Sequence, residues 1–223
     1  MTTNIAPLSG GEIDNNSSER AILVDAPVVP EIAPEDALRA GAYQLLARLL
    51  RMAPERRLLN QLSAHHVPEQ PGEDEVAVAL RLLGLAASST TADSADDEYH
   101  QLFIGVGRGE LVPFGSWYQT GFLMEKPLSL LRDDLARLGF ERREQVYESE
   151  DHVAALSEVM AMLIESGADY DVQQKFYNDH LGPWVGRFFE DLQKANNACF
   201  YRAVGRFGSA FCTLENWVLN LSV

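Results

Sequence analysis

The acidic and imidazole run Glu150-Asp151-His152 is the clearest candidate for chemistry in this sequence, and it stands at the predicted start of a helix. A carboxylate at a helix N-terminus complements the helix dipole, and Asp151 is of the right type to cap exposed backbone N–H groups. The helix end and the two carboxylates act in opposite directions on the pKa of His152, so charge alone leaves its protonation state open. We interpret the run as a helix cap that also offers carboxylate groups to a guanidinium-bearing peptide.

A second candidate is a metal site formed by dispersed histidines. His100, His152 and His180, with Glu98 and Asp151, could converge inside a helical bundle. The repeated Glu-x-x-His pairs that build di-iron sites are missing, so a helical metal-dependent enzyme is the alternative hypothesis. The pair at 65–66 is also histidine, but it has no carboxylate or cysteine at ligand spacing, and we interpret it as part of a solvated loop.

The glycine-rich stretch from Gly105 to Gly109 resembles a phosphate-binding loop only superficially. It follows a helical pattern instead of a strand, and it lacks the Lys-Ser/Thr pair of a P-loop. A tight connection between helices, ended by Pro113, is the better interpretation. Ser116 lacks the Gly-x-Ser-x-Gly context of a nucleophile elbow. We therefore assign no catalytic and no metal-binding residues.

Helices must position these groups, because apolar residues recur with helical spacing along most of the chain and no period-2 alternation predicts a strand. Residues 1–33 are rich in Asn, Ser, Gly and Pro and are expected to form a mostly disordered tail. Residues 34–223 are expected to form one all-α bundle of about eight to ten helices. The first predicted helix begins at Pro34, and the others span 55–64, 73–87, 97–103, 116–125, 128–138, 150–164, 169–180, 184–195 and 198–221. A polar connection is predicted at 88–96 and a charged connection at 141–149.

The composition excludes several classes of function. The 223 residues carry a formal net charge of -15, with 18 Lys and Arg against 33 Asp and Glu, which argues against binding nucleic acid. Two cysteines give neither a disulfide framework nor metal spacing, so a reduced, cytoplasmic compartment is expected. We find neither a secretory signal nor an apolar run of the roughly 20 residues that span a bilayer.

Four short motifs, taken together, resemble one family. They are Glu98-Tyr99-x-x-Leu102-Phe103-x-Gly105, then Pro113-x-x-Ser116-x-Tyr118, then Glu150-Asp151-His152, and last His180-Leu181-x-Pro183-Trp184. Their order and spacing resemble the TorD/DmsD/NarJ family of chaperones for molybdenum redox enzymes over roughly residues 36–221, and the TorD-like branch fits best. Each motif is weak alone, but several that agree make the signal specific.

The resemblance implies an all-helical, cytoplasmic chaperone rather than an enzyme. Such a chaperone binds the twin-arginine (Tat) signal peptide, the apo-core of a molybdoenzyme, or both, assists loading of the molybdenum cofactor and delays export until the partner has folded. The partner would be an enzyme such as a trimethylamine oxide reductase, a dimethyl sulfoxide reductase or a formate dehydrogenase. The residues that the resemblance assigns to binding are Asp151, His152, Glu98, Gly105, Pro113, Ser116, Trp117 and Tyr118.

The resemblance also carries implications for cofactors and oligomeric state. It implies no stably bound cofactor but weak guanine-nucleotide binding, which no residue pattern supports independently. It allows a monomer or a helix-swapped dimer, with 138–151 as the hinge. Two positions depart from the family pattern: Gly105-Val106-Gly107 stands where Gly-Pro-Gly is common, and Leu156 stands where a Glu often follows the Asp-His pair.

Overall fold

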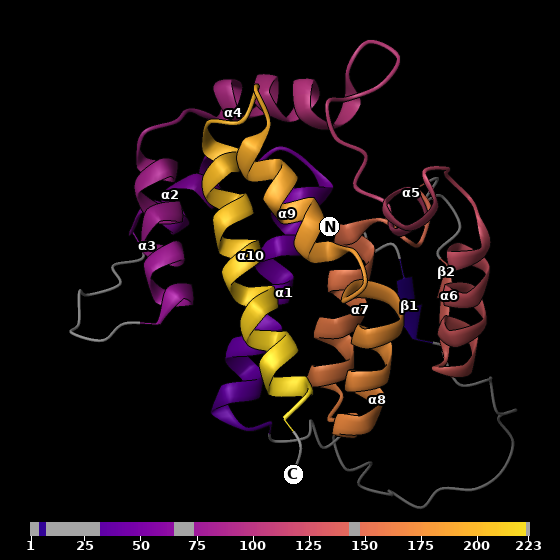
Figure 1. Cartoon of the computed structure of the whole chain (residues 1–223). Helices are drawn as coiled ribbons and strands as arrows, with labels where there is room; N and C mark the ends of the chain where they lie inside the picture. The colour runs from indigo at the N-terminus through magenta and orange to yellow at the C-terminus, as the bar shows by residue number, and fades with distance from the viewer. Residues whose placement is uncertain (1–4, 8–31, 65–73, 143–147, 222–223) are drawn as a thin grey trace, which may run out of the picture.

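A computed structural model describes residues 5–7, 32–64, 74–142 and 148–221. Within them lie ten α-helices, two π-helical turns and two short strands (Figure 1). In chain order the elements are β1 (Ile5–Pro7), α1 (Pro34–Arg51), α2 (Arg56–Ala64), α3 (Glu75–Ser88), α4 (Ala92–Tyr99), η1 (His100–Ile104), α5 (Gly115–Thr120), α6 (Lys126–Arg137), β2 (Phe140–Arg142), α7 (Val153–Glu165), α8 (Tyr170–Phe176), η2 (Tyr177–Leu181), α9 (Val185–Lys194) and α10 (Phe200–Leu219). The predicted all-α bundle is confirmed.

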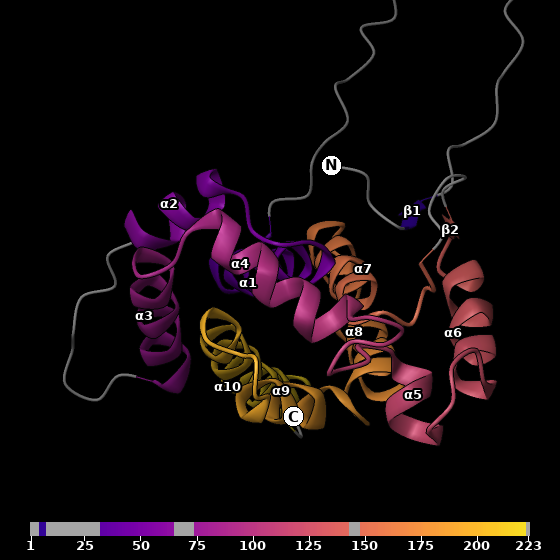
Figure 2. The ribbon, with the colours of Figure 1, turned by 90° about the horizontal axis from the view of Figure 1, so that it is seen from above.

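Helix α7 is the centre of the bundle. Ten of its residues are buried, on nearly every face, as is typical of a helix enclosed by other helices. It packs along α1, and Figure 2 shows these two helices side by side between the α2–α3 pair and the α5–α6 pair. The predicted apolar residues of α7, among them Leu156 and Met160, are all in the core. None of the described helices is long and apolar enough to cross a membrane.

Helices α9 and α10 pack very closely, and α10 also contacts α3. Gly208 of α10 permits this approach, because a Cβ atom at that position would lie 2.3 Å from the ring of Phe189 on α9. A buried polar link ties α10 to α1: Arg39 donates from Nε to Glu215 Oε1 at 2.6 Å, and Tyr43 donates to Oε2 at 3.0 Å. These contacts fix α10 against both neighbours.

Three sequence predictions on secondary structure were wrong. Residues 5–7 and 140–142 form an antiparallel pair of strands, although no strand was expected and 5–7 fall in the segment assigned to a disordered tail. Helix α4 begins at Ala92, inside the polar connection predicted at 88–96, and its N-cap Thr91 accepts a hydrogen bond from Ser94 N at 3.2 Å. The helix predicted at 116–125 ends at Thr120, because Gly121 adopts φ +82.

Several predictions fall on residues that the structure does not describe. The rest of the tail at 1–4 and 8–31, the histidine pair at 65–66 and residues 143–147 of the hinge lie outside the described residues. The division into a tail and one helical domain stays a prediction.

Candidate functional site

Asp151 stabilises the start of α5. Its Oδ2 accepts hydrogen bonds from the backbone N of Ser116 at 2.8 Å and from the Ser116 hydroxyl at 2.6 Å, and its Oδ1 accepts one from Ser149 Oγ at 2.6 Å. All three contacts hold a side chain that is only 3% exposed. Asp151 therefore caps a helix, as predicted, but the helix is α5 and not the one that follows it in sequence.

His152 is the N-cap of α7. Its Nδ1 accepts a hydrogen bond from Ala154 N at 3.1 Å, so Nδ1 carries no proton and Nε2 is left to face Glu148 Oε1 at 3.4 Å. Burial, with a contribution from the charge of Arg51, lowers the pKa of His152 to about 3. The imidazole is therefore neutral near pH 7, which settles the state that charge arithmetic left open.

The backbone at residues 151–153 also forms hydrogen bonds with the chain segment before α5. Val153 N donates to Pro113 O at 2.9 Å, and Gly115 N donates to Asp151 O at 2.9 Å. The ring of Phe114 packs edge-on against His152, with centroids 4.9 Å apart. The structure thus brings Pro113, Ser116, Asp151 and His152 together, four of the residues assigned to the site.

Trp184 supports α5 from another side. Its indole N–H donates to His180 O at 2.7 Å, and its ring stacks on Tyr118 with centroids 5.6 Å apart. A Cβ atom on Gly115 would lie 3.0 Å from Trp184 Nε1, so only glycine fits there without displacing the ring. Two motifs far apart in sequence, around Ser116 and around Trp184, therefore meet at α5.

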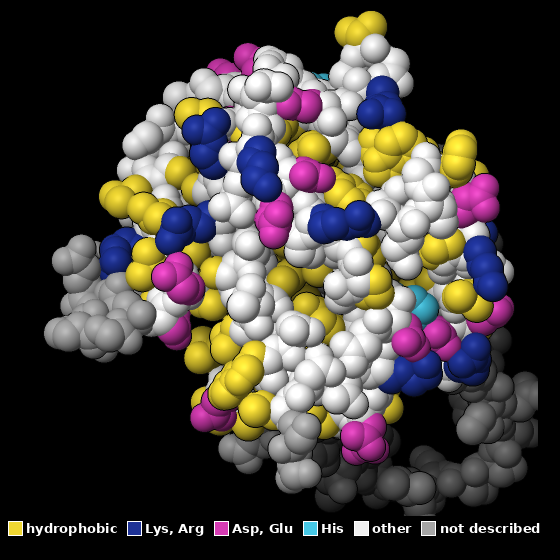
Figure 3. All heavy atoms as spheres, viewed as in Figure 1, with side chains coloured by type: hydrophobic (Ala, Val, Ile, Leu, Met, Phe, Trp, Pro, Cys, Tyr) yellow, Lys and Arg dark blue, Asp and Glu magenta, His cyan; other side chains and the backbone are white. Residues whose placement is uncertain are grey.

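The elements held in this way present an exposed apolar surface. We call Trp117, Tyr118, Phe122, Leu123 and Met124 the α5 surface. Phe122, Leu123 and Met124 are 67%, 49% and 79% exposed, whereas the two aromatic residues are half-buried. Figure 3 shows hydrophobic side chains gathered over the region where Figure 1 places α5. Sequence reasoning missed the run 122–124, although three large apolar residues after a helix-ending glycine are a detectable signal.

Glu98 has different partners. Its carboxylate accepts hydrogen bonds from the backbone N of Cys199, Phe200 and Tyr201 at 2.7, 3.0 and 2.7 Å. It therefore caps the first turn of α10, and none of these contacts joins it to Asp151. Gly105 ends η1: its N–H donates to His100 O at 2.7 Å and its φ is +60, a conformation that favours glycine.

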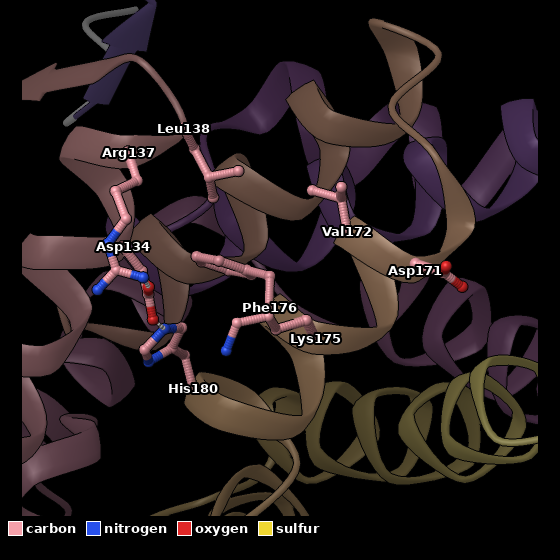
Figure 4. A pocket seen from close by; sticks show the side chains of 8 residues that line it. All are labelled: Asp134, Arg137, Leu138, Asp171, Val172, Lys175, Phe176 and His180. Atoms are coloured by element: carbon pink, nitrogen blue, oxygen red, sulfur yellow. Dashed lines mark hydrogen bonds and ion pairs between the residues drawn. The ribbon is translucent and has the colours of Figure 1, made fainter.

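The three histidines proposed as metal ligands do not converge. His100 is exposed and lies against Asp96, and His152 is buried against Phe114. His180 Nε2 contacts Asp134 Oδ2 at 2.8 Å, in a cavity of about 290 Å³ between α6 and α8 (Figure 4). Burial lowers the pKa of His180 against the opposing effect of Asp134, so a neutral ring donates this bond near pH 7.

A group with metal-ligand spacing exists, but its charges are already neutralised. Among the described side chains, Asp134, Asp179 and His180 place one ligand atom each within 4.8 Å of the others. Asp134 is also paired with Arg137 at 2.5 Å, and Asp179 is paired with Lys175. The positively charged side chains of Arg137 and Lys175 thus already pair with these carboxylates. The geometry therefore does not favour the alternative hypothesis of a metal-dependent enzyme.

These observations define an all-α protein in which the acidic and histidine residues stabilise helix ends and support an exposed apolar surface. The family model described as nitrate reductase delta subunit matches residues 69–190, more than half of the chain. The chain therefore belongs to this family, the TorD/NarJ family, and the resemblance inferred from the motifs is confirmed.

Two relatives agree with this assignment. The chain is 26% identical to the chaperone protein TorD of Vibrio atlanticus over 67% of this chain and 74% of that protein. It is 29% identical to the Tat proofreading chaperone DmsD of Salmonella typhi over 66% of this chain and 72% of that protein. A solved structure from Archaeoglobus fulgidus, assigned to redox enzyme maturation, aligns with 88% of this chain and 99% of its own at 18% identity and a TM-score of 0.46.

Proposed function

We propose that this protein is a chaperone that binds the Tat signal peptide, the apo-core of a molybdoenzyme, or both, assists molybdenum cofactor insertion and prevents premature export. The observation that carries the proposal is its membership in a family whose matched relatives are named TorD and DmsD chaperones. A cytoplasmic location and the absence of a stably bound cofactor are parts of the same proposal, as is weak guanine-nucleotide binding.

The geometry supports binding without turnover. Three of the acidic and histidine side chains of the motifs are occupied by backbone or hydroxyl hydrogen bonds: Asp151 holds Ser116, Glu98 holds α10 and His152 caps α7. Residues in such roles position a surface, and they do not act as nucleophile or base. We assign peptide contact to the α5 surface. The residues to which we assign a positioning role are Asp151, His152, Ser116, Pro113, Gly105 and Glu98.

The apolar side chains of the α5 surface and the net charge of the protein suit the binding of a signal peptide. A Tat signal combines a pair of arginines with an apolar stretch, and exposed apolar side chains are suited to the apolar part. A net charge of -15 attracts the basic part. Met124 adopts φ +61, a conformation that is uncommon for a residue other than glycine, and this turn keeps its side chain exposed.

The test is calorimetric titration of the purified protein with signal peptides from candidate partners, which are a trimethylamine oxide reductase, a dimethyl sulfoxide reductase and a formate dehydrogenase. Each peptide is compared with its Lys-Lys version. We expect one Arg-Arg peptide to bind with micromolar or better affinity, about -8 kcal/mol. Failure of every peptide to bind would contradict the signal-peptide part of the proposal.

Two variants locate the binding surface. Phe122→Ser should weaken binding by about 10- to 150-fold, because burial of a large apolar side chain contributes roughly 1.5–3 kcal/mol. Leu38→Ser on α1 is the matched control, since Leu38 is similarly exposed, at 76%, and lies outside the α5 surface. Equal losses in both variants would show that the apolar contact is not specific to the α5 surface.

A further inference from the structure

Two arginines of the chain already lie against the aromatic rings of the α5 surface. The guanidinium carbon of Arg108 is 4.7 Å from the ring centroid of Trp117, and that of Arg187 is 5.8 Å from the ring centroid of Tyr118. Arg187 also donates to the backbone carbonyl of Tyr118. The two adjacent rings are therefore each paired with a guanidinium group.

We propose that the ring face of Trp117 is a binding site for an arginine of the partner peptide, and that Arg108 occupies this site until the peptide displaces it. The inference rests on the proposed function, because the peptide supplies the competing guanidinium group. It adds a subsite for arginine at Trp117 and identifies Arg108, a residue of the chain itself, as the competitor for this subsite.

Arg108 is held weakly enough to be displaced. Its side chain is exposed and, among the residues that the structure describes, forms no hydrogen bond or ion pair, so the ring of Trp117 is its main contact. Arg51 shows the contrast, since two of its nitrogens bind Glu158 at 3.0 and 2.7 Å. An arginine held only by a ring at the surface contributes little energy, and another guanidinium can replace it.

The loop that carries Arg108 needs no rearrangement at its base. Leu111 N donates to Leu102 O at 2.8 Å, and Gly109 packs so closely that a Cβ atom would lie 2.5 Å from the backbone of Phe103. Above this base, Val106 is fully exposed between Gly105 and Gly107, which adopt φ +60 and +90. Rotation of the long Arg108 side chain is sufficient to vacate the ring.

The subsite also explains why arginine is preferred to lysine. The planar guanidinium stacks on an aromatic face and is less strongly hydrated than an ammonium group, and Trp is the best of the aromatic rings for such a contact. A Lys-Lys peptide would therefore gain less than an Arg-Arg peptide when Arg108 is removed.

The experiment is a double-mutant cycle by calorimetry with the Arg-Arg peptide. Arg108→Gln should bind about 2- to 5-fold tighter than the unmodified protein, the range expected for an exposed cation–ring contact. Arg57→Gln is the matched control, because it removes the same charge from an exposed position on α2, on the opposite side of the molecule in Figures 1 and 2. In a Trp117→Leu background the gain from Arg108→Gln should vanish.

The outcomes separate this inference from the proposed function. If the unmodified protein binds the Arg-Arg peptide and Arg108→Gln changes nothing, the subsite is overturned while the chaperone function stands. An equal gain in Arg57→Gln, or a gain that persists without Trp117, also overturns it. If Trp117→Leu does not fold, Trp117→Phe replaces it, and the gain should then shrink. Failure of all variants to bind overturns both this inference and the signal-peptide part of the proposed function.

Discussion

Replacement of Asp151 separates a positioning role from direct contact with the peptide. Asp151→Ala removes three hydrogen bonds, at 2.8, 2.6 and 2.6 Å, and leaves the buried N–H of Ser116 without its acceptor. A lost cap and an unsatisfied buried donor together cost about 2–4 kcal/mol of unfolding free energy. Asp151→Asn keeps an oxygen for Ser116 but loses the charge and the second oxygen, which accepts from Ser149, so it should cost about 1 kcal/mol.

The peptide affinities of the same two variants provide the assay. If Asp151 acts through α5, Asp151→Asn should bind the peptide nearly as well as the unmodified protein. Asp151→Ala, still folded, should bind about tenfold more weakly, which corresponds to about 1.4 kcal/mol. A direct bond to a guanidinium group would instead make both variants lose affinity equally, because both lose the charge. Urea denaturation and calorimetry on the same preparations give the two quantities, and equal affinity losses would refute the positioning role.

Ser149→Ala is the matched control for this prediction. It removes only the bond to Asp151 Oδ1 and leaves both bonds between Asp151 and Ser116 intact. We expect a loss of roughly 1 kcal/mol in stability and an unchanged peptide affinity. A loss of affinity as large as that of Asp151→Ala would mean that the anchoring of α5 does not explain the effect of Asp151.

Two further predictions concern the other helix caps. The pKa of His152 is about 3 in the folded protein and near 6.5 in the unfolded chain. Between these two pH values the unfolded chain binds a proton that the folded protein does not bind. This histidine therefore leaves the free energy of unfolding unchanged above about pH 6.5 and lowers it by about 1.4 kcal/mol per pH unit as the pH drops toward 3. Urea midpoints between pH 7 and 5 measure this slope, and His152→Asn, which keeps a good cap, should flatten it. Glu98→Ala should cost about 2–4 kcal/mol and speed hydrogen exchange at Tyr201 N, whereas Glu190→Ala, which breaks only an exposed pair at 3.5 Å, should change neither.

The helices with strong apolar periodicity were predictable, because their burial follows directly from sequence spacing. Apolar residues that recur with helical spacing in α7 and α9, such as Phe188, are buried. The first part of α4 was missed because the sequence of this helix, ADSADDEY, is polar and rich in aspartate, which favours loops. Contacts with α10 and the cap at Thr91 compensate for that weak propensity. Strands of three residues are too short to show a period of two.

The site was predictable in its residue types but not in its connections. Asp151 stands next to the start of α7, so local rules assign its carboxylate to that helix. Its actual partner, Ser116, is 35 residues away, at the start of a helix that also packs on Trp184. Glu98 similarly caps a helix about 100 residues downstream. Sequence spacing does not predict such contacts, because the distance between the two residues depends on the fold and not on their separation in the sequence.

The proposed peptide-binding role accounts for the distribution of roles in this site. Apolar side chains such as Phe122 and Met124 must stay exposed before the partner arrives, so no neighbour in the fold can hold them. Rigidity must then come from beneath, and buried caps such as Asp151 supply it without using the exposed face. A net charge of -15 opposes self-association through the exposed run while it favours a cationic ligand. We therefore expect the same acidity to oppose aggregation of the free protein and to attract basic peptides.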